Sequence, residues 1–159
     1  MGFTKPLLFA VASYAIGSAA LAAPPASLPG VGHIGKARQD WILQCQGCHR
    51  ADASGTADTT PAMNGVIGSF LKVPGGREFL VQVPGVSTAP LTDKALASLV
   101  NWTLWTFDKE NIPADFEPYT ASEVGELRKT PLRVDTDKRR AELIALIEQL
   151  EDGGAGAKN

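Results

Sequence analysis

One five-residue stretch decides how this chain is interpreted: Cys45-Gln46-Gly47-Cys48-His49. Residues three and four positions apart share one face of a helix, so both thiols and the imidazole can point to one side. A CxxCH run is the attachment signature of c-type haem, in which the thiols bond to the porphyrin and the imidazole binds the iron. We therefore predict one covalently attached haem c, held by Cys45 and Cys48 and ligated axially by His49.

Two other kinds of site use closely spaced cysteines. A structural zinc ion takes four Cys or His ligands, and the chain offers only Cys45, Cys48, His33 and His49. Using all four would place the neighbours Cys48 and His49 on one tetrahedral ion. A thioredoxin-type dithiol starts a helix directly after a buried strand. Residues 36–44 are instead mixed polar and apolar and predict a helix leading into the motif, so both alternatives rank well below haem.

The first 22 residues have the pattern of a secretory signal peptide. Lys5 precedes an apolar stretch from Leu7 to Ile16, and Ala20-Leu21-Ala22 fits an A-x-A cleavage site. A retained anchor is the less favoured alternative, because the stretch is shorter than the ~20 residues that span a bilayer. We expect cleavage before Ala23, a periplasmic location and no stable membrane insertion afterwards.

The charge composition of the chain bears on which kinds of macromolecule it could bind. The chain has 15 basic and 17 acidic residues and a formal net charge of −2. Loss of the 22-residue segment removes one basic residue, Lys5, so the remaining 137 residues carry −3 before any haem propionate is counted. This balance argues against nucleic acid as a partner. A chain of this length suits a single domain.

The hydrophobic pattern predicts a mainly α domain, because no segment sustains the period-two alternation of a strand. Thr92 is a candidate N-cap, and Thr120 with Glu123 forms a candidate capping box. The small, polar residues 50–60 predict a solvated loop. We expect a flexible leader at 23–35, helices at about 36–48, 77–83, 93–108, 121–129 and 135–150, and a disordered tail at 153–159.

These residues resemble a class I c-type cytochrome, a small all-α haem domain. In that family the CxxCH motif ends the first helix, which crosses the last core helix. Ala37 and Trp41 match the small and aromatic residues of the first helix, and Leu99 and Trp102 match their contacts on the other. The match covers roughly residues 35–107.

The resemblance implies a small cytochrome c-like helical domain at 36–108, wrapped around one covalent haem. Residues 109–152 form a C-terminal helical extension that we cannot match to the family. Pro61 matches the proline whose carbonyl accepts a hydrogen bond from the ligating imidazole, a contact that orients the ring and raises its basicity.

The distal ligand of the iron departs from the family pattern. The family normally supplies a Met sulfur from the loop before the last core helix, and here that loop, residues 83–91, contains no Met. Met63 is the only Met after the signal peptide and is our tentative distal ligand, although it stands where the family has a Leu packed against the haem. His33 and an open iron are the alternatives, and Lys72, Lys94 and Tyr119 are weaker candidates.

The resemblance implies an electron-transfer protein, not an enzyme. It would carry one electron at a time between a dehydrogenase and an acceptor such as an oxidase or another cytochrome, as a monomer or as a subunit of a redox complex. The absence of Met from residues 83–91 supports the alternative, a haem-based protein or enzyme that binds a small ligand at an open distal position.

Overall fold

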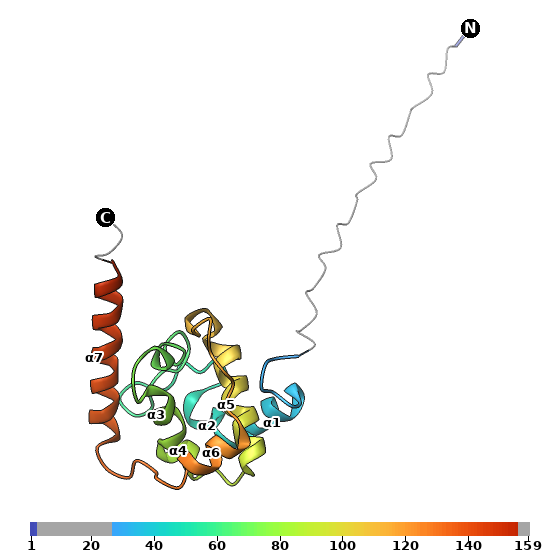
Figure 1. The fold of residues 1–159 in the computed structure, drawn as a ribbon. Helices are drawn as coiled ribbons and strands as arrows, with labels where there is room; N and C mark the ends of the chain where they lie inside the picture. Colours follow the sequence, from blue (N-terminus) through green and yellow to red (C-terminus); the bar gives the residue numbers. More distant parts are fainter. Residues whose placement is uncertain (3–26, 156–159) are drawn as a thin grey trace.

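The computed structural model describes residues 1–2 and 27–155. The signal-peptide prediction, its cleavage site and residues 156–159 lie outside these ranges. The described residues form helices and turns without a strand, apart from an isolated bridge between Thr56 and Thr60 (Figure 1). The predicted mainly α, cytochrome c-like fold is thereby confirmed. In chain order the elements are α1 (Ile34–Gln44), α2 (Gln46–His49), η1 (Ser69–Lys72), α3 (Gly76–Gln82), α4 (Pro84–Ser87), α5 (Asp93–Phe107), η2 (Lys109–Asn111), α6 (Ala121–Leu127) and α7 (Thr136–Ala155).

The single helix predicted at 36–48 is two helices. Cys45 leaves the helical region (φ −125°, ψ −42°) and ends α1, although its amide still donates to the Trp41 carbonyl (2.9 Å). The Cys45 carbonyl then accepts the amides of both Cys48 (3.2 Å) and His49 (3.0 Å), which starts the separate turn α2. The prediction of a continuous helix was wrong. The spacing of apolar residues does not reveal that one residue, Cys45, has non-helical backbone angles.

The crossing of α1 and α5 forms the centre of the main core. Ala37 and Trp41 are 1% and 2% exposed, and the small Ala37 side chain lets the two helices approach closely. The Trp41 ring lies 6.1 Å from Trp102 and 4.7 Å from Phe107, measured between centroids. Such aromatic pairs add to the free energy gained by burying their area.

Two predicted helix starts are present. The Thr92 hydroxyl accepts the Ala95 amide (3.3 Å) at the start of α5, and the Thr120 hydroxyl accepts the Glu123 amide (3.2 Å) at the start of α6. The predicted capping box of Thr120 and Glu123 is only half formed. Its Glu123 carboxylate accepts two hydrogen bonds of 2.5 and 2.8 Å from Arg77 of α3 instead.

Residues after 108 pack into the same hydrophobic core as residues 36–108. Val124 of α6 is fully buried and Tyr119 is 3% exposed, both in the cluster that contains Trp41. The Asn101 side chain bonds to both backbone groups of Tyr119 (2.9 Å each), and the Arg77 guanidinium lies 4.1 Å from the centre of the Tyr119 ring. α6 is therefore held to both α3 and α5.

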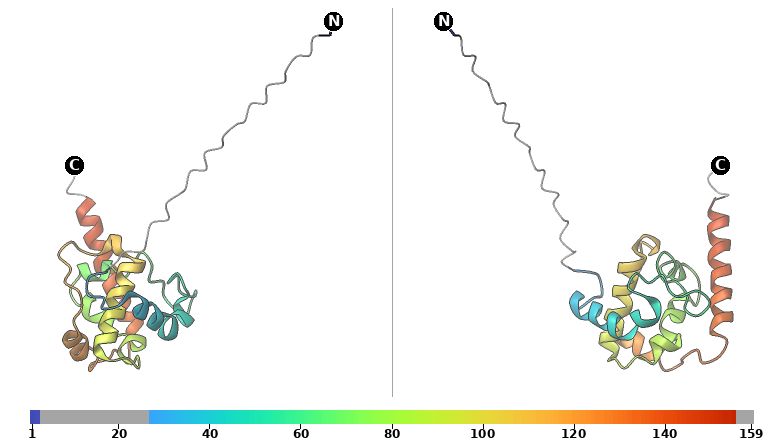
Figure 2. Two further views of the ribbon diagram at one scale, coloured as in Figure 1. Left: turned by 90° about the vertical axis from the view of Figure 1, so that its right-hand side faces the viewer. Right: turned by 180° about the vertical axis from the view of Figure 1, so that it is seen from behind.

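Helix α7 lies at the edge of the domain and extends past it at its C-terminal end (Figures 1 and 2). Leu143 and Ile147 pack on Phe70 and Phe79 in a second, smaller cluster. The helix continues to Ala155, beyond the predicted end at 150 and into the expected tail. Within 27–155, no helix has both the length and the hydropathy of a transmembrane span.

We expect Val124→Ala to lower the free energy of unfolding of the whole protein by about 2 kcal/mol, because it leaves a cavity under α6. Val134 is 75% exposed, so Val134→Ala is a matched control whose effect should stay within about 0.5 kcal/mol. Urea unfolding followed by circular dichroism measures both. A separate early transition in Val124→Ala, with the main transition unmoved, would show that α6 folds independently.

Candidate haem site

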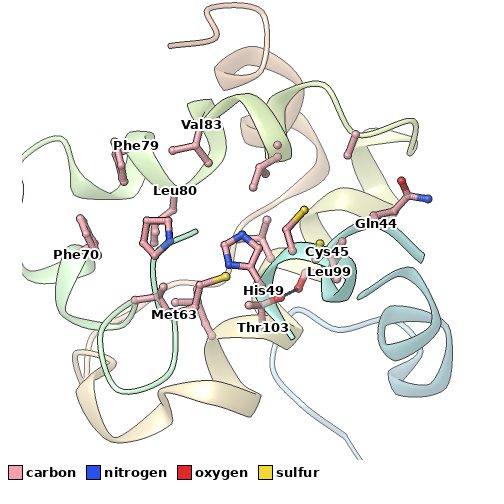
Figure 3. Close-up of a pocket in the computed structure, with 18 of the residues that line it drawn as sticks. Gln44, Cys45, His49, Met63, Phe70, Phe79, Leu80, Val83, Leu99 and Thr103 are labelled. Carbon is pink, nitrogen blue, oxygen red and sulfur yellow. Dashed lines mark hydrogen bonds between the residues drawn. The ribbon is translucent and has the colours of Figure 1, made fainter. Parts of the chain in front are cut away.

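A mainly apolar pocket opens beside the CxxCH motif (Figure 3). Its walls come from five parts of the chain: the end of α1 with α2, the loop at 61–67, the segment from η1 to α4, the inner face of α5 and the start of α7. The lining residues are Trp41, Gln44, Cys45, Cys48, His49, Pro61, Ala62, Met63, Ile67, Phe70, Phe79, Leu80, Val83, Gly85, Val86, Ala89, Leu96, Leu99, Val100, Thr103, Leu104, Thr136, Asp137 and Arg140.

The two cysteines of the motif lie at the edge of this pocket as free thiols. Cys45 is half-buried, and Cys48 is exposed. Burial raises the pKa of the Cys45 thiol to about 11, with smaller contributions from the negative charges of Asp40 and Cys48. In the folded chain Cys45 is therefore protonated at neutral pH, and the break at Cys45 places the two thiols on successive turns.

His49 is held as a neutral imidazole. Burial lowers its pKa, and the nearby Pro61 carbonyl opposes the shift to a lesser extent. Its Nδ1 atom is buried and has no partner within hydrogen-bond geometry, so the Pro61 carbonyl is close enough to influence the pKa without a formed hydrogen bond. A neutral imidazole of this kind is the form that binds metals.

These residues fit a c-type haem. Two free thiols and a neutral imidazole line one edge of a pocket whose walls are otherwise mostly apolar side chains, as a porphyrin plane requires. A small shift would let the orphaned Nδ1 of His49 donate to the Pro61 carbonyl, which is the contact predicted for Pro61. The Trp41 Nε1 atom is also buried without a partner, and we assign it no role.

Met63 lines the same pocket as His49, and both are labelled in Figure 3. Its amide donates to the Ala53 carbonyl (2.8 Å), and its carbonyl accepts the Ile67 amide (3.1 Å). The loop at 50–60 is not uniformly solvated as predicted, because this bonding turns Ala53 inward and buries it completely. Met63 is thus fixed to the loop that directly follows the motif.

The other distal candidates lie elsewhere in the described chain. The His33 Nδ1 atom accepts the Lys36 amide (3.2 Å) and caps α1, and Lys94 lines a second, shallow pocket beside His33. The Tyr119 hydroxyl donates to the Arg77 carbonyl (2.7 Å), and Lys72 binds the Ser69 hydroxyl (3.3 Å). None of these four side chains lines the pocket beside the motif.

Sequence reasoning missed Arg128, which follows α6. Its guanidinium donates to the carbonyls of Ala89 (2.6 Å), Leu91 (2.8 Å) and Ser87 (3.0 Å), within the segment expected to carry the distal Met. That segment is also more ordered than predicted, since Pro84–Ser87 forms α4. In the sequence, Arg128 looks like any solvated residue at the end of a short helix, and no local signal distinguishes it.

Comparison with known proteins finds two curated relatives, both cytochrome c-552 from Thermus thermophilus, the second of them from a specified strain of that organism. Each is 28% identical to this chain over 118 aligned positions, which cover 61% of this chain. The alignments cover 90% and 80% of the respective relatives. No family model matches the chain, and no solved structure does. The similarity suggests a c-type cytochrome and is consistent with the observed fold.

If Cys45 and Cys48 each form a thioether, haem should stay with the polypeptide after unfolding in acidified acetone. We expect Cys45→Ala and Cys48→Ala to retain haem through the remaining bond and the double variant Cys45→Ala/Cys48→Ala to release it. Absorbance of the precipitated and soluble fractions measures this. Release of haem from the unsubstituted protein would contradict covalent attachment.

Proposed function

We propose that this protein is a monohaem, class I c-type cytochrome that carries single electrons between a dehydrogenase and a downstream acceptor. The observation that carries the proposal is the set of groups at one edge of the apolar pocket, namely the thiols of Cys45 and Cys48 and the neutral His49 imidazole. Similarity to two cytochromes c-552 supports a haem-containing electron carrier in general.

In this proposal the haem supplies a reversible one-electron couple. The chain's residues attach it, orient it and set its potential. Cys45 and Cys48 fix the porphyrin at the end of α1, and His49 binds the iron through Nε2. Donation from the Nδ1–H group to the nearby Pro61 carbonyl would fix the ring orientation and make Nε2 a stronger donor. The apolar walls keep water away and disfavour the additional positive charge of the oxidised state.

The exposed Cys48 side chain suggests where electrons enter and leave. A porphyrin edge attached there lies near the surface, where a redox partner can approach it. Small, transient interfaces are usual for such encounters. The predicted signal peptide would place the protein in the periplasm, where a dehydrogenase, an oxidase or another cytochrome is the partner class we propose.

The test is a spectroelectrochemical titration of the purified haem protein. We expect one reversible transition with a one-electron Nernst slope, about 59 mV per decade, and no turnover of hydrogen peroxide. His49→Ala should shift the midpoint potential and the visible spectrum because it removes the proposed axial ligand. An irreversible transition, or steady peroxide consumption, would argue for an enzyme instead.

A further inference from the structure

The pocket has one wall that offers no side chain able to ligate iron. Leu80, Val83, Val86 and Ala89 form it, from α3 through α4 to the segment before α5. Figure 3 shows Leu80 and Val83 on a ribbon separate from the one that carries His49, with the pocket between them. This apolar wall is where the family resemblance would place a Met sulfur.

Met63 is the remaining candidate ligand among the described lining residues. Apart from the motif itself, it is the only lining side chain with sulfur or imidazole, and its backbone is tied to Ala53 in the loop next to the motif. Met63 packs against the main core cluster, whose Trp41 ring lies 6.2 Å from the His49 ring. This position suits packing against the edge of the haem, a role in which thioether side chains serve well.

The carboxylate and guanidinium nearest the pocket belong to α7. Asp137 and Arg140 lie in the first two turns of that helix, and Asp137 is exposed. These two side chains come from α7, whereas the apolar wall comes from α3, α4 and the segment before α5. The four wall side chains themselves present only methyl and methylene groups, and the cationic lining side chain beside them, Arg140, comes from α7, which packs against Leu80 and Val83.

We infer that the haem face turned towards the apolar wall has no protein ligand and binds a neutral diatomic molecule, with carbon monoxide as the probe. The inference rests on the proposed haem at His49. Polarity and hydrogen-bond donors on the distal side decide which ligands are held. Carbon monoxide is uncharged and needs no hydrogen-bond donor on the wall in order to bind. Binding forms one iron–carbon bond and transfers no electron.

Arg128 explains how such a wall is held without a bond to iron. In a Met-ligated cytochrome the iron–sulfur bond anchors this segment. Here the Arg128 guanidinium binds the carbonyls of three alternate residues, Ser87, Ala89 and Leu91, at 2.6–3.0 Å. It also binds the Asp93 carboxylate (3.1 Å) at the start of α5. Charged donors make the stronger class of hydrogen bond, and the planar guanidinium fixes all of its acceptors at once.

The same stretch of chain also holds the other end of the wall. The Leu132 amide donates to the Gln82 carbonyl (2.9 Å), and the Gln82 side chain donates to the Thr130 hydroxyl (2.9 Å). Residues 128–132 therefore form hydrogen bonds with Gln82, which precedes the wall residues Val83 and Val86, and with residues 87–91, which follow them. The wall has a defined shape that depends on the C-terminal part of the chain, and Arg128 is its positioning residue.

The first experiment uses the full-length haem protein, with haem content established by the pyridine haemochrome assay. We expect a high-spin spectrum and a clear Soret shift when carbon monoxide is added to the reduced protein. A red charge-transfer band in the oxidised protein, with no response to carbon monoxide, would show Met ligation and overturn the inference while leaving the electron carrier intact. Absence of covalent haem would overturn both.

Met63→Leu separates packing from ligation. Leucine has a similar volume and no sulfur, so a packing role predicts the same spin state and carbon monoxide affinity as the unsubstituted protein. Loss of a low-spin spectrum on this substitution, together with newly acquired carbon monoxide binding, would identify Met63 as the distal ligand and overturn the inference.

The role of Arg128 is tested with Arg128→Gln and Arg128→Lys against Arg133→Gln, which makes the same charge change at an exposed position nearby. We expect Arg128→Gln to change the carbon monoxide dissociation rate and to speed amide exchange in residues 83–91 by roughly tenfold, since hydrogen bonds to a charged group are lost. Arg128→Lys, which keeps the charge without the planar fork, should fall in between. Equal effects of Arg128→Gln and Arg133→Gln would show that Arg128 does not position the wall.

Discussion

The crossing of α1 and α5 is the contact on which the rest of this structure depends. Ala37 is small enough for close approach, and Trp41 fills the angle between the helices against Trp102 and Phe107. Because α1 is held there, the chain that leaves it at Cys45 begins from a fixed position. The loop that follows holds the motif in place, because the Thr56 hydroxyl donates to the Cys48 carbonyl (3.3 Å) and the Gly55 amide donates to the His49 carbonyl (3.1 Å). Helix α5 provides the pocket's inner wall.

Local features of the sequence were sufficient for most of the helices and for the grouping of Cys45, Cys48 and His49 at one pocket. The hydroxyl caps at Thr92 and Thr120 involve partners three residues away, and the spacing of Cys45, Cys48 and His49 is a property of five consecutive residues. The break at Cys45 was missed because it is a change in backbone angle within a helical pattern. The position of the motif in the pocket depends in addition on the helix crossing and on the hydrogen bonds from Gly55 and Thr56.

Contacts between distant parts of the chain could not be predicted in this way. Glu123 looks like a capping residue and instead binds Arg77, 46 residues earlier. Arg128 reaches carbonyl groups 37 to 41 residues before it. Every residue has a backbone carbonyl. The residue types at 87, 89 and 91 therefore give no sign that a guanidinium binds there. The C-terminal helices were predicted, but their contacts with the pocket wall before α5 had to be seen in the fold.

The order of these contacts along the chain bears on how the protein matures. Arg128 follows Cys48 by 80 residues, so a chain emerging from its N-terminus presents both thiols before the segment that completes the pocket exists. The rise in the Cys45 pKa comes mainly from burial, and a thiol must ionise to act as a nucleophile. If haem is attached as proposed, a chain in which Cys45 is not yet buried is the more reactive substrate for attachment, and folding afterwards encloses the product.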